Sequence, residues 1–298
     1  MKAEGKVVVV GAGLMGTGIA HAFAVGGSEV VIVDTSDQQR AKAAAQIAKL
    51  LDDGVARGKI EAAAALAAKQ RITTAAAIAG HAADAALLVE TATEDLGVKH
   101  AILQAAAAAL PADALIATNT SALSISEIAA AIDAPARVIG MHFFNPVPKM
   151  KLVEIIKGLE TSAEALEVAI AWVARIGKDH IVVNEAPGFT TSRMSAMMGN
   201  EAMYMLAEGV ASAEDIDKAL RMAFNHPMGP LEVGDLTGWD TRLRVLQYLH
   251  TVLGEKFRPC PLIIKMVKAG RHGRKVGRGV YEYDAAGAQV AGSGLRIN

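Results

Sequence analysis

The stretch VVVVGAGLMGTG, residues 7–18, decides how the first half of the chain folds. Its four valines predict a strand that is buried on both faces, and a helix-like segment at 14–25 follows directly. Gly11, Gly13 and Gly16 join the two elements with the spacing of a G-x-G-x-x-G turn. Such a turn lets the backbone approach a pyrophosphate at a helix N-terminus, so the stretch predicts a dinucleotide-binding unit.

An acidic residue closes the next predicted strand, at 29–33. Asp34 lies 18 residues beyond Gly16, close to the spacing of ~20 expected for a carboxylate that binds a ribose. It would repel a 2′-phosphate, and no arginine follows it directly, so we expect the cofactor NAD rather than NADP. A glycine-rich turn of an α/β fold without a ligand is the alternative.

The composition excludes several classes of partner. The chain has 298 residues, 52% of them hydrophobic, which is enough for two domains. Its 30 basic and 31 acidic residues give a formal charge of −1, so no basic excess points to nucleic acid or an anionic membrane. Cys260 is the only cysteine, which fits a reducing cytoplasm. The N-terminus does not resemble a signal peptide, and no apolar run is long enough for a membrane span.

Strand-like and helix-like segments alternate along the first part of the chain. The predicted strands after the glycine turn are 85–90, 114–118, 137–143, 151–157 and 180–183, with helices at 97–110, 124–132 and 162–176. The segment 37–70 predicts one or two exposed helices, broken near Gly54 and Gly58. This alternation is typical of an α/β domain with a mostly parallel sheet.

The pattern changes near Pro187 and Gly188, and helices dominate beyond them. Helices are predicted at 189–208, 212–220, 240–253 and 261–269, with one late strand candidate at 279–283. Ser212 with Asp215 forms a variant of the capping box. We therefore expect an α/β protein with a Rossmann-type doubly wound sheet at 1–186 and an all-helical C-terminal domain at 187–298.

His142 and Glu154 lie in apolar surroundings, on two neighbouring strand candidates. Buried ionisable groups are costly unless they are paired, so the two residues indicate either a structural pair or a reaction centre. His142 closes one strand of the sheet and Ser121 follows another, at the end of the strands where ligands of such folds bind. In the alternative, Glu154 is a surface residue of an edge strand, Ser121 caps the next helix and Asn145 shapes an Asn-Pro turn.

Five longer motifs identify a family. They are GAGLMGTGIA, ATNTSALSI, GMHFFNPVPKMKLVEII, NHPMGPLEVGDLTGWD and GRKVGRGVYEY, in this order. Together they resemble the L-3-hydroxyacyl-CoA dehydrogenase family, in its short bacterial form that acts on 3-hydroxybutyryl-CoA. The resemblance implies NAD-dependent oxidation of (S)-3-hydroxyacyl-CoA to 3-oxoacyl-CoA and the reverse reaction. It also implies an acyl-CoA thioester as substrate and a homodimer formed by the helical domain.

The resemblance implies a role for each matching residue. His142 is the general base, Glu154 its paired carboxylate, and Ser121 and Asn145 hold the substrate oxygen. The implied cofactor contacts are Gly11, Gly13, Leu14, Met15, Gly16, Asp34, Glu94, Lys99, Asn119 and Lys275. Arg57 falls where the family tends to carry a lysine toward the CoA phosphates. Ser192 departs from the family pattern, because it stands in GFTTSR where an asparagine is usual.

Two other functions remain open from the sequence. One is a dehydrogenase of the same fold that acts on a free hydroxy acid or sugar acid. The other is a non-catalytic NAD-binding structural protein. No metal site is expected, since the histidines and the single cysteine lack ligand spacing.

Overall fold

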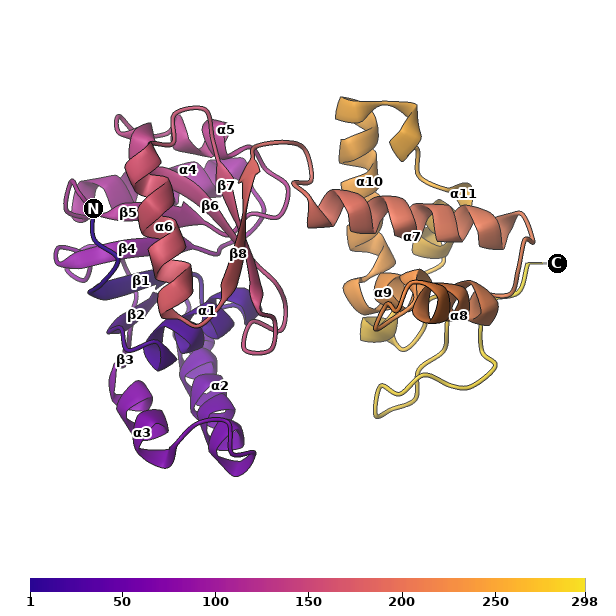
Figure 1. Cartoon of the computed structure of the whole chain (residues 1–298), viewed down its shortest axis with the longest axis horizontal. Helices are drawn as coiled ribbons and strands as arrows, with labels where there is room; N and C mark the ends of the chain where they lie inside the picture. Colours follow the sequence, from indigo (N-terminus) through magenta and orange to yellow (C-terminus); the bar gives the residue numbers. More distant parts are fainter. Residues whose placement is uncertain (298) are drawn as a thin grey trace. The chain divides into compact units, whose positions relative to one another are not determined.

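The structure is a computed structural model that describes residues 1–297. The chain folds as two compact units, Met1–Ala186 and Pro187–Asn298. Figure 1 shows a sheet flanked by helices in the first unit and a group of helices in the second. The predicted fold class, a Rossmann-type doubly wound sheet followed by a helical domain, is confirmed.

An eight-stranded sheet forms the centre of the first unit, in the order β3-β2-β1-β4-β5-β6-β7-β8. The strands are β1 Lys6–Val10, β2 Val30–Val33, β3 Ile72–Ala75, β4 Ala85–Glu90, β5 Leu115–Thr118, β6 Val138–Phe143, β7 Leu152–Lys157 and β8 Asp179–Asn184. Neighbours from β3 to β6 are parallel, whereas β7 runs antiparallel to β6 and β8 runs parallel to β7. The strand order reverses between β1 and β4, which is where ligands bind in doubly wound sheets.

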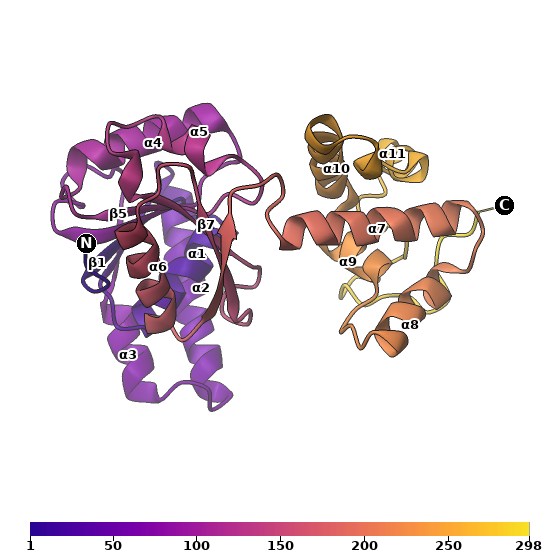
Figure 2. The ribbon, with the colours of Figure 1, turned by 45° about the horizontal axis from the view of Figure 1, so that its top comes forward.

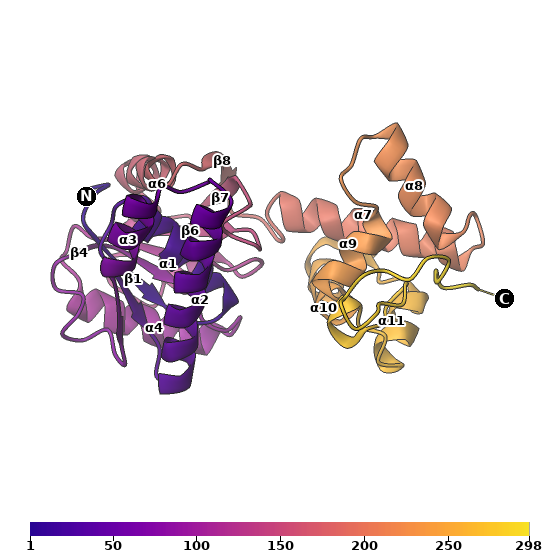
Figure 3. The same ribbon diagram turned by 90° about the horizontal axis from the view of Figure 1, so that it is seen from below.

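Helices cover both faces of this sheet. They are α1 Leu14–Val25, α2 Asp37–Ala56, α3 Ala62–Gln70, α4 Leu96–Ala109, α5 Ile125–Ala129 and α6 Ala163–Arg175, with a 3₁₀ turn η1 at Pro135–Arg137. α1 and α6 share one face, where the rings of Phe23 and Trp172 meet edge to face with centroids 5.7 Å apart. Figure 2 shows α4 and α5 on the other side of the sheet, and Figure 3 shows α2 and α3 side by side.

The local sequence explains where these elements begin. The side chains of Ser36, Asp95, Ser124 and Ser162 each accept a hydrogen bond from the amide three residues later, which caps α2, α4, α5 and α6. The valines of β1 are buried because helices cover both sides of a parallel sheet. The expected strands and helices of this unit are found within a few residues of their predicted bounds.

Two details of the elements predicted for this unit are wrong. The helix does not break at Gly54, which lies inside α2; a Cβ there would come within 2.8 Å of Ile60 Cδ1, so the glycine admits a close packing contact. The chain turns instead around Gly58, as expected, where φ is +64°. The strand β3 was not predicted, because it is a short edge strand whose Thr73 and Thr74 are exposed.

The second unit consists of helices around its own core. They are α7 Thr191–Ala207, α8 Ala213–Ala223, α9 Pro230–Thr237, α10 Trp239–Leu253 and α11 Pro261–Lys268, with 3₁₀ turns η2 Glu255–Phe257 and η3 Arg274–Val276. Trp239, Leu246, Phe257 and Tyr281 lie in the core. Ser212 caps α8 as predicted. The strand candidate at 279–283 contributes only isolated bridges.

Over residues 1–297, no helix is both long enough and apolar enough to cross a membrane. Within the same residues, no group of three or more histidine, cysteine, aspartate or glutamate side chains is arranged to hold a metal ion.

Candidate active site

Two glycines of the turn after β1 are required by the packing of the turn itself. Gly11 has φ +106°, and a Cβ there would lie 2.8 Å from Thr91 Oγ1. A Cβ on Gly16 would lie 1.8 Å from the carbonyl oxygen of Gly11. Glycine at both positions therefore lets α1 start directly against the turn and the end of β4.

Gly13 is different, because nothing in the chain requires a glycine at this position. It caps α1 with φ −73°, which any residue adopts, and a Cβ there would meet no heavy atom within 4 Å. The open space lies at the N-terminus of α1, where backbone amides point outward. The residues of the turn therefore fit a bound pyrophosphate, which would occupy the space that a side chain at Gly13 would fill.

The carboxylate of Asp34 lies beside the glycine turn. Its Oδ2 accepts the amide of Ala12 at 2.9 Å, and its Oδ1 accepts the amide of Ser36 at 2.9 Å. Each oxygen keeps a second lone pair, so the carboxylate can accept ribose hydroxyls without leaving these contacts. The guanidinium of Arg40 donates to the Asp34 carbonyl and to Asp37. Both of these contacts are within the protein.

Glu94 and Ser121 are in direct contact. Glu94 Oε1 accepts the amide of Ser121 at 2.8 Å, its hydroxyl at 3.2 Å, and the hydroxyl of Thr120 at 2.7 Å. Burial alone would raise the pKa of Glu94, but the Lys99 ammonium and these hydrogen bonds outweigh it and hold the pKa below its usual range. Glu94 is therefore ionised at neutral pH, and Ser121 does not cap α5, whose cap is Ser124.

Lys99 lies behind Glu94 and is almost fully buried. Its Nζ donates to Glu90 Oε2 at 2.8 Å and lies 3.3 Å from Glu94 Oε2. Glu90, at the end of β4, also accepts the hydroxyl of Thr118 at 2.6 Å. In the structure, Lys99 therefore holds the carboxylates of Glu90 and Glu94 together. A contact between Lys99 and the cofactor stays a prediction.

His142 and Glu154 form a buried pair. They face each other in the antiparallel ladder of β6 and β7, and His142 Nδ1 lies 2.7 Å from Glu154 Oε2. The side chain of Glu154 is 0% exposed and that of His142 9%. Because β6 runs parallel to β1, the pair lies near the carboxyl ends of the parallel strands, where the glycine turn also lies. The alternative of an exposed Glu154 is wrong.

The loop after β6 borders a cavity of about 330 Å³ beside the glycine turn. The loop contains a cis peptide bond between Asn145 and Pro146. The cavity is lined by Ala12, Gly13, Leu14, Thr17, Gly18, Gln39, Lys42, Ala43, Gln46, Leu50, Asn145, Pro146, Val147 and Pro148.

Asn119 takes no part in this lining. Its Oδ1 accepts the amide of Phe143 at 2.8 Å and so connects the end of β5 to β6.

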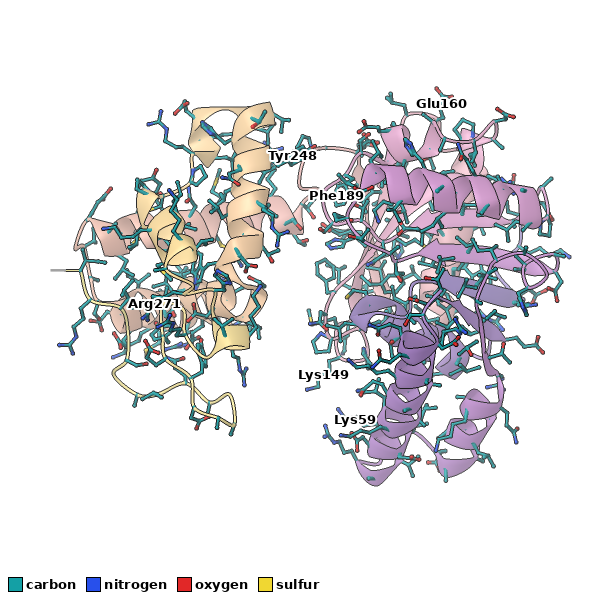
Figure 4. All side chains as sticks on the ribbon, turned by 180° about the vertical axis from the view of Figure 1, so that it is seen from behind. Lys59, Lys149, Glu160, Phe189, Tyr248 and Arg271 are labelled. Carbon is teal, nitrogen blue, oxygen red and sulfur yellow. The ribbon has the colours of Figure 1, made fainter. Side chains whose placement is uncertain are left out.

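The remaining predicted residues are divided between the two units. Met15 is half-buried in the first turn of α1. Arg57 is exposed at the end of α2, two residues before Lys59 at the tip of the α2–α3 hairpin (Figure 4). In the second unit, Ser192 lies in the first turn of α7, and Lys275 Nζ lies 2.6 and 2.7 Å from the carboxylate oxygens of Asp240.

Comparison with known proteins identifies the family. Residues 6–186 match the model described as 3-hydroxyacyl-CoA dehydrogenase, NAD binding domain, and residues 188–283 match the C-terminal domain of the same enzymes. The chain belongs to the 3-hydroxyacyl-CoA dehydrogenase family. The resemblance drawn from the five motifs is confirmed, and the protein is an NAD-dependent oxidoreductase of this family.

Several members of the 3-hydroxyacyl-CoA dehydrogenase family are similar over nearly their whole length. The chain is 43% identical over 282 residues to the 3-hydroxybutyryl-CoA dehydrogenase of Bradyrhizobium diazoefficiens, covering 94% of this chain and 96% of that one. A probable 3-hydroxybutyryl-CoA dehydrogenase of Bacillus subtilis is 40% identical over 280 residues, with 94% and 97% covered. The crystal structure of (S)-3-hydroxybutyryl-CoA dehydrogenase from Ralstonia eutropha has a TM-score of 0.90 and 42% identity, with 94% and 99% covered.

Sequence reasoning missed Glu90 and Thr120 in this 3-hydroxyacyl-CoA dehydrogenase. Glu90 closes an apolar strand next to the glycine turn, as Asp34 does, and that shared position is a signal that could have found it. Thr120 had no comparable signal, because its partner Glu94 lies 26 residues away in the chain.

Proposed function

We propose that the protein interconverts (S)-3-hydroxybutyryl-CoA and 3-oxobutyryl-CoA with NAD. The observation that carries the proposal is the buried pair of His142 and Glu154, at the same sheet edge as the glycine turn. A dehydrogenase that oxidises an alcohol needs a base for the hydroxyl proton, and a histidine is suited to this task near neutral pH. The names of the most similar relatives support the thioester substrate.

His142 acts as the general base in this proposal. Its Nδ1 proton is donated to the Glu154 carboxylate, so Nε2 is the ring nitrogen that takes the proton from the substrate hydroxyl. The negative charge of Glu154 stabilises the imidazolium that forms and holds the ring in one orientation. In the reverse reaction His142 returns the proton to the oxygen of the 3-oxo group.

Ser121 and Asn145 position the substrate oxygen. The backbone amide of Ser121 is held by Glu94. The Ser121 hydroxyl, which donates to Glu94 at 3.2 Å, would turn to donate to the substrate oxygen that His142 deprotonates. Asn145 borders the cavity of about 330 Å³, and its amide is proposed to contact the acyl group. On the substrate side we also assign Ser192 and, for the CoA phosphates, the exposed Arg57.

NAD, when bound, would supply the hydride acceptor for the oxidation. The residues proposed to hold it are Gly11, Gly13, Leu14, Met15, Gly16, Asp34, Glu94, Lys99, Asn119 and Lys275. Among these, the open space at Gly13 and the carboxylate of Asp34 fit the cofactor best, since the first would admit a pyrophosphate and the second would accept ribose hydroxyls.

We also propose that the protein works in the cytoplasm as a homodimer. Cys260 is free and buried, which fits a reducing compartment. At the end of α8 the side chains of Met222 and Phe224 are 75% and 69% exposed, and exposed apolar side chains of this size favour an association surface. Sedimentation of the purified protein at micromolar concentration tests the dimer, and a monomer at that concentration would contradict it.

A substrate panel tests the proposed reaction. NADH oxidation is followed with 3-oxoacyl-CoA thioesters of four to ten carbons, and with free acetoacetate at the same concentrations. We expect turnover with the four-carbon thioester and little with the free acid. Turnover with the free acid alone would favour a hydroxy-acid dehydrogenase, and NADH binding without any turnover would favour a structural protein. NADPH serves as the cofactor control and is expected to react poorly.

A further inference from the structure

A buried ion pair lies behind the residues assigned to the reaction. The side chain of Glu90 is 0% exposed and that of Lys99 is 1% exposed, with Lys99 Nζ 2.8 Å from Glu90 Oε2. The carboxylate of Glu90 also accepts the hydroxyl of Thr118 at 2.6 Å and the amide of Ala92 at 2.6 Å. Apolar residues of similar volume often stabilise a fold as well as such a pair does, so stability alone does not explain why charged residues occupy these positions.

The ion pair is connected to the proposed substrate contact. Lys99 Nζ also lies 3.3 Å from Glu94 Oε2. The other oxygen of Glu94 accepts the amide and the hydroxyl of Ser121. Glu94 therefore connects Glu90 and Lys99 to Ser121, and its side chain is 41% exposed.

The charges of the three side chains sum to a net negative charge. Glu90 and Glu94 each carry one negative charge, and Lys99 carries one positive charge. Since Lys99 is neutralised by the buried Glu90, the excess charge remains on the more exposed Glu94. Without the charge of Glu90, the ammonium of Lys99 would neutralise Glu94 instead.

We propose that Glu90 is a positioning residue: by neutralising Lys99 it leaves Glu94 a full negative charge beside Ser121, which favours the oxidised, cationic cofactor over the reduced one. The inference rests on the proposed function, in which Ser121 holds the oxygen of the carbon that exchanges hydride with the nicotinamide ring. That ring is positively charged in NAD⁺ and neutral in NADH. A negative charge next to Ser121 therefore stabilises bound NAD⁺ but not bound NADH.

Glu90→Gln separates this role from a structural one. The substitution keeps the size of the side chain and removes its charge, so the net charge of the three groups becomes zero. Dissociation constants of NAD⁺ and NADH are measured by calorimetry without substrate, so the result does not depend on turnover. We expect NAD⁺ affinity to fall about tenfold relative to NADH affinity. A structural defect alone would lower the affinities for NAD⁺ and NADH by the same factor.

Two further variants complete the experiment. Glu90→Gln combined with Lys99→Met removes both buried charges and leaves Glu94 negative, so the affinity ratio is expected to return toward that of the wild type. Glu127→Gln on α5 is the matched control, because it removes one negative charge from an exposed side chain. It is expected to leave the ratio unchanged.

The outcomes are distinct. The inference is supported if the ratio of NAD⁺ to NADH affinity shifts in Glu90→Gln and recovers in the double variant. Equal losses of affinity for both cofactors, or no recovery of the ratio, overturn it. If Glu90→Gln alone does not fold because it leaves Lys99 unpaired, Lys99→Met is compared with the double variant. The single variant keeps the negative charge of Glu90, so it should bind NAD⁺ more tightly relative to NADH than the double variant does, and equal affinity ratios would overturn the inference. A wild-type protein that binds both cofactors but lacks thioester turnover would instead contradict the proposed function.

Discussion

His142 on β6 and Glu154 on β7 stand directly opposite each other in an antiparallel ladder, with Nδ1 and Oε2 2.7 Å apart. Residues in register on neighbouring strands have their side chains on the same face of the sheet. The pair is therefore fixed by the backbone of two strands and does not depend on a flexible loop. Both side chains are nearly excluded from water, which strengthens the interaction of the imidazole with the carboxylate.

Removing the charge of Glu154 is expected to reduce turnover. In Glu154→Gln the side-chain carbonyl can still accept the Nδ1 proton, but the imidazolium loses its negative partner. We expect kcat with the four-carbon thioester to fall about 100-fold or more, with a small change in KM. Glu160→Gln is the matched control, since Glu160 is exposed in the loop after β7 (Figure 4). A Glu154→Gln variant with more than half of the wild-type kcat would contradict the role of the carboxylate.

Gly13 and Gly16 are expected to respond differently to alanine. Gly16→Ala places a Cβ 1.8 Å from the Gly11 carbonyl, so the fold of the turn is disturbed and the melting temperature falls even without cofactor. Gly13→Ala meets no atom of the chain within 4 Å, so stability changes by about 1 kcal/mol or less. Its NADH affinity is nevertheless expected to fall by about tenfold or more, because the methyl group occupies the space of the pyrophosphate.

Thermal unfolding without cofactor and NADH titration distinguish the two glycines. Wild-type NADH affinity in Gly13→Ala would mean that the pyrophosphate does not lie at this position.

Asp217 is expected to make the stability of the second unit depend on pH. It is buried at the N-terminus of α9, accepting the amides of Leu231 and Glu232 and the hydroxyl of Tyr281. Burial raises the pKa of Asp217 from 3.8 to about 6, despite the hydrogen bonds that lower it. Because the pKa is higher in the folded state, the stabilisation is complete below the unfolded pKa and is lost as the pH rises through about 6.

Urea unfolding at pH 5 and pH 7 tests this dependence. The shift corresponds to about 3 kcal/mol in total, of which about 1 kcal/mol is lost between these two pH values. Asp217→Asn does not titrate, so the free energy of unfolding of the wild type relative to this variant should fall by that amount. An equal difference between the two proteins at both pH values would contradict the raised pKa.

The sequence was sufficient to predict most elements of the first unit. Strands such as β1 and β4 are apolar except for one terminal residue, because both faces of a parallel sheet are covered, and that composition is visible without a structure. β3 was missed because an edge strand needs few apolar residues. α9 was missed because its eight residues begin with Pro230 and lie between Gly229 and Gly238, where turn signals outweigh a short helical pattern.

The candidate site could be predicted only in part. His142 and Glu154 lie on two strands that follow each other in the chain, so their contact was a reasonable expectation. The chain of contacts from Glu90 through Lys99 and Glu94 to Ser121 joins residues from β4, α4 and the end of β5. Contacts between side chains of different elements depend on tertiary packing, and the periodicity and motif spacing of the sequence do not reveal them.

The turnover of His142→Gln tests the central claim most directly. The variant and the wild type are compared in NADH affinity and in the rate of NADH oxidation with 3-oxobutyryl-CoA. If His142 carries the proton, NADH affinity stays within about twofold of the wild type while turnover falls by roughly 10²- to 10⁴-fold. A folded His142→Gln variant whose turnover stays within a few-fold of the wild type would contradict the account.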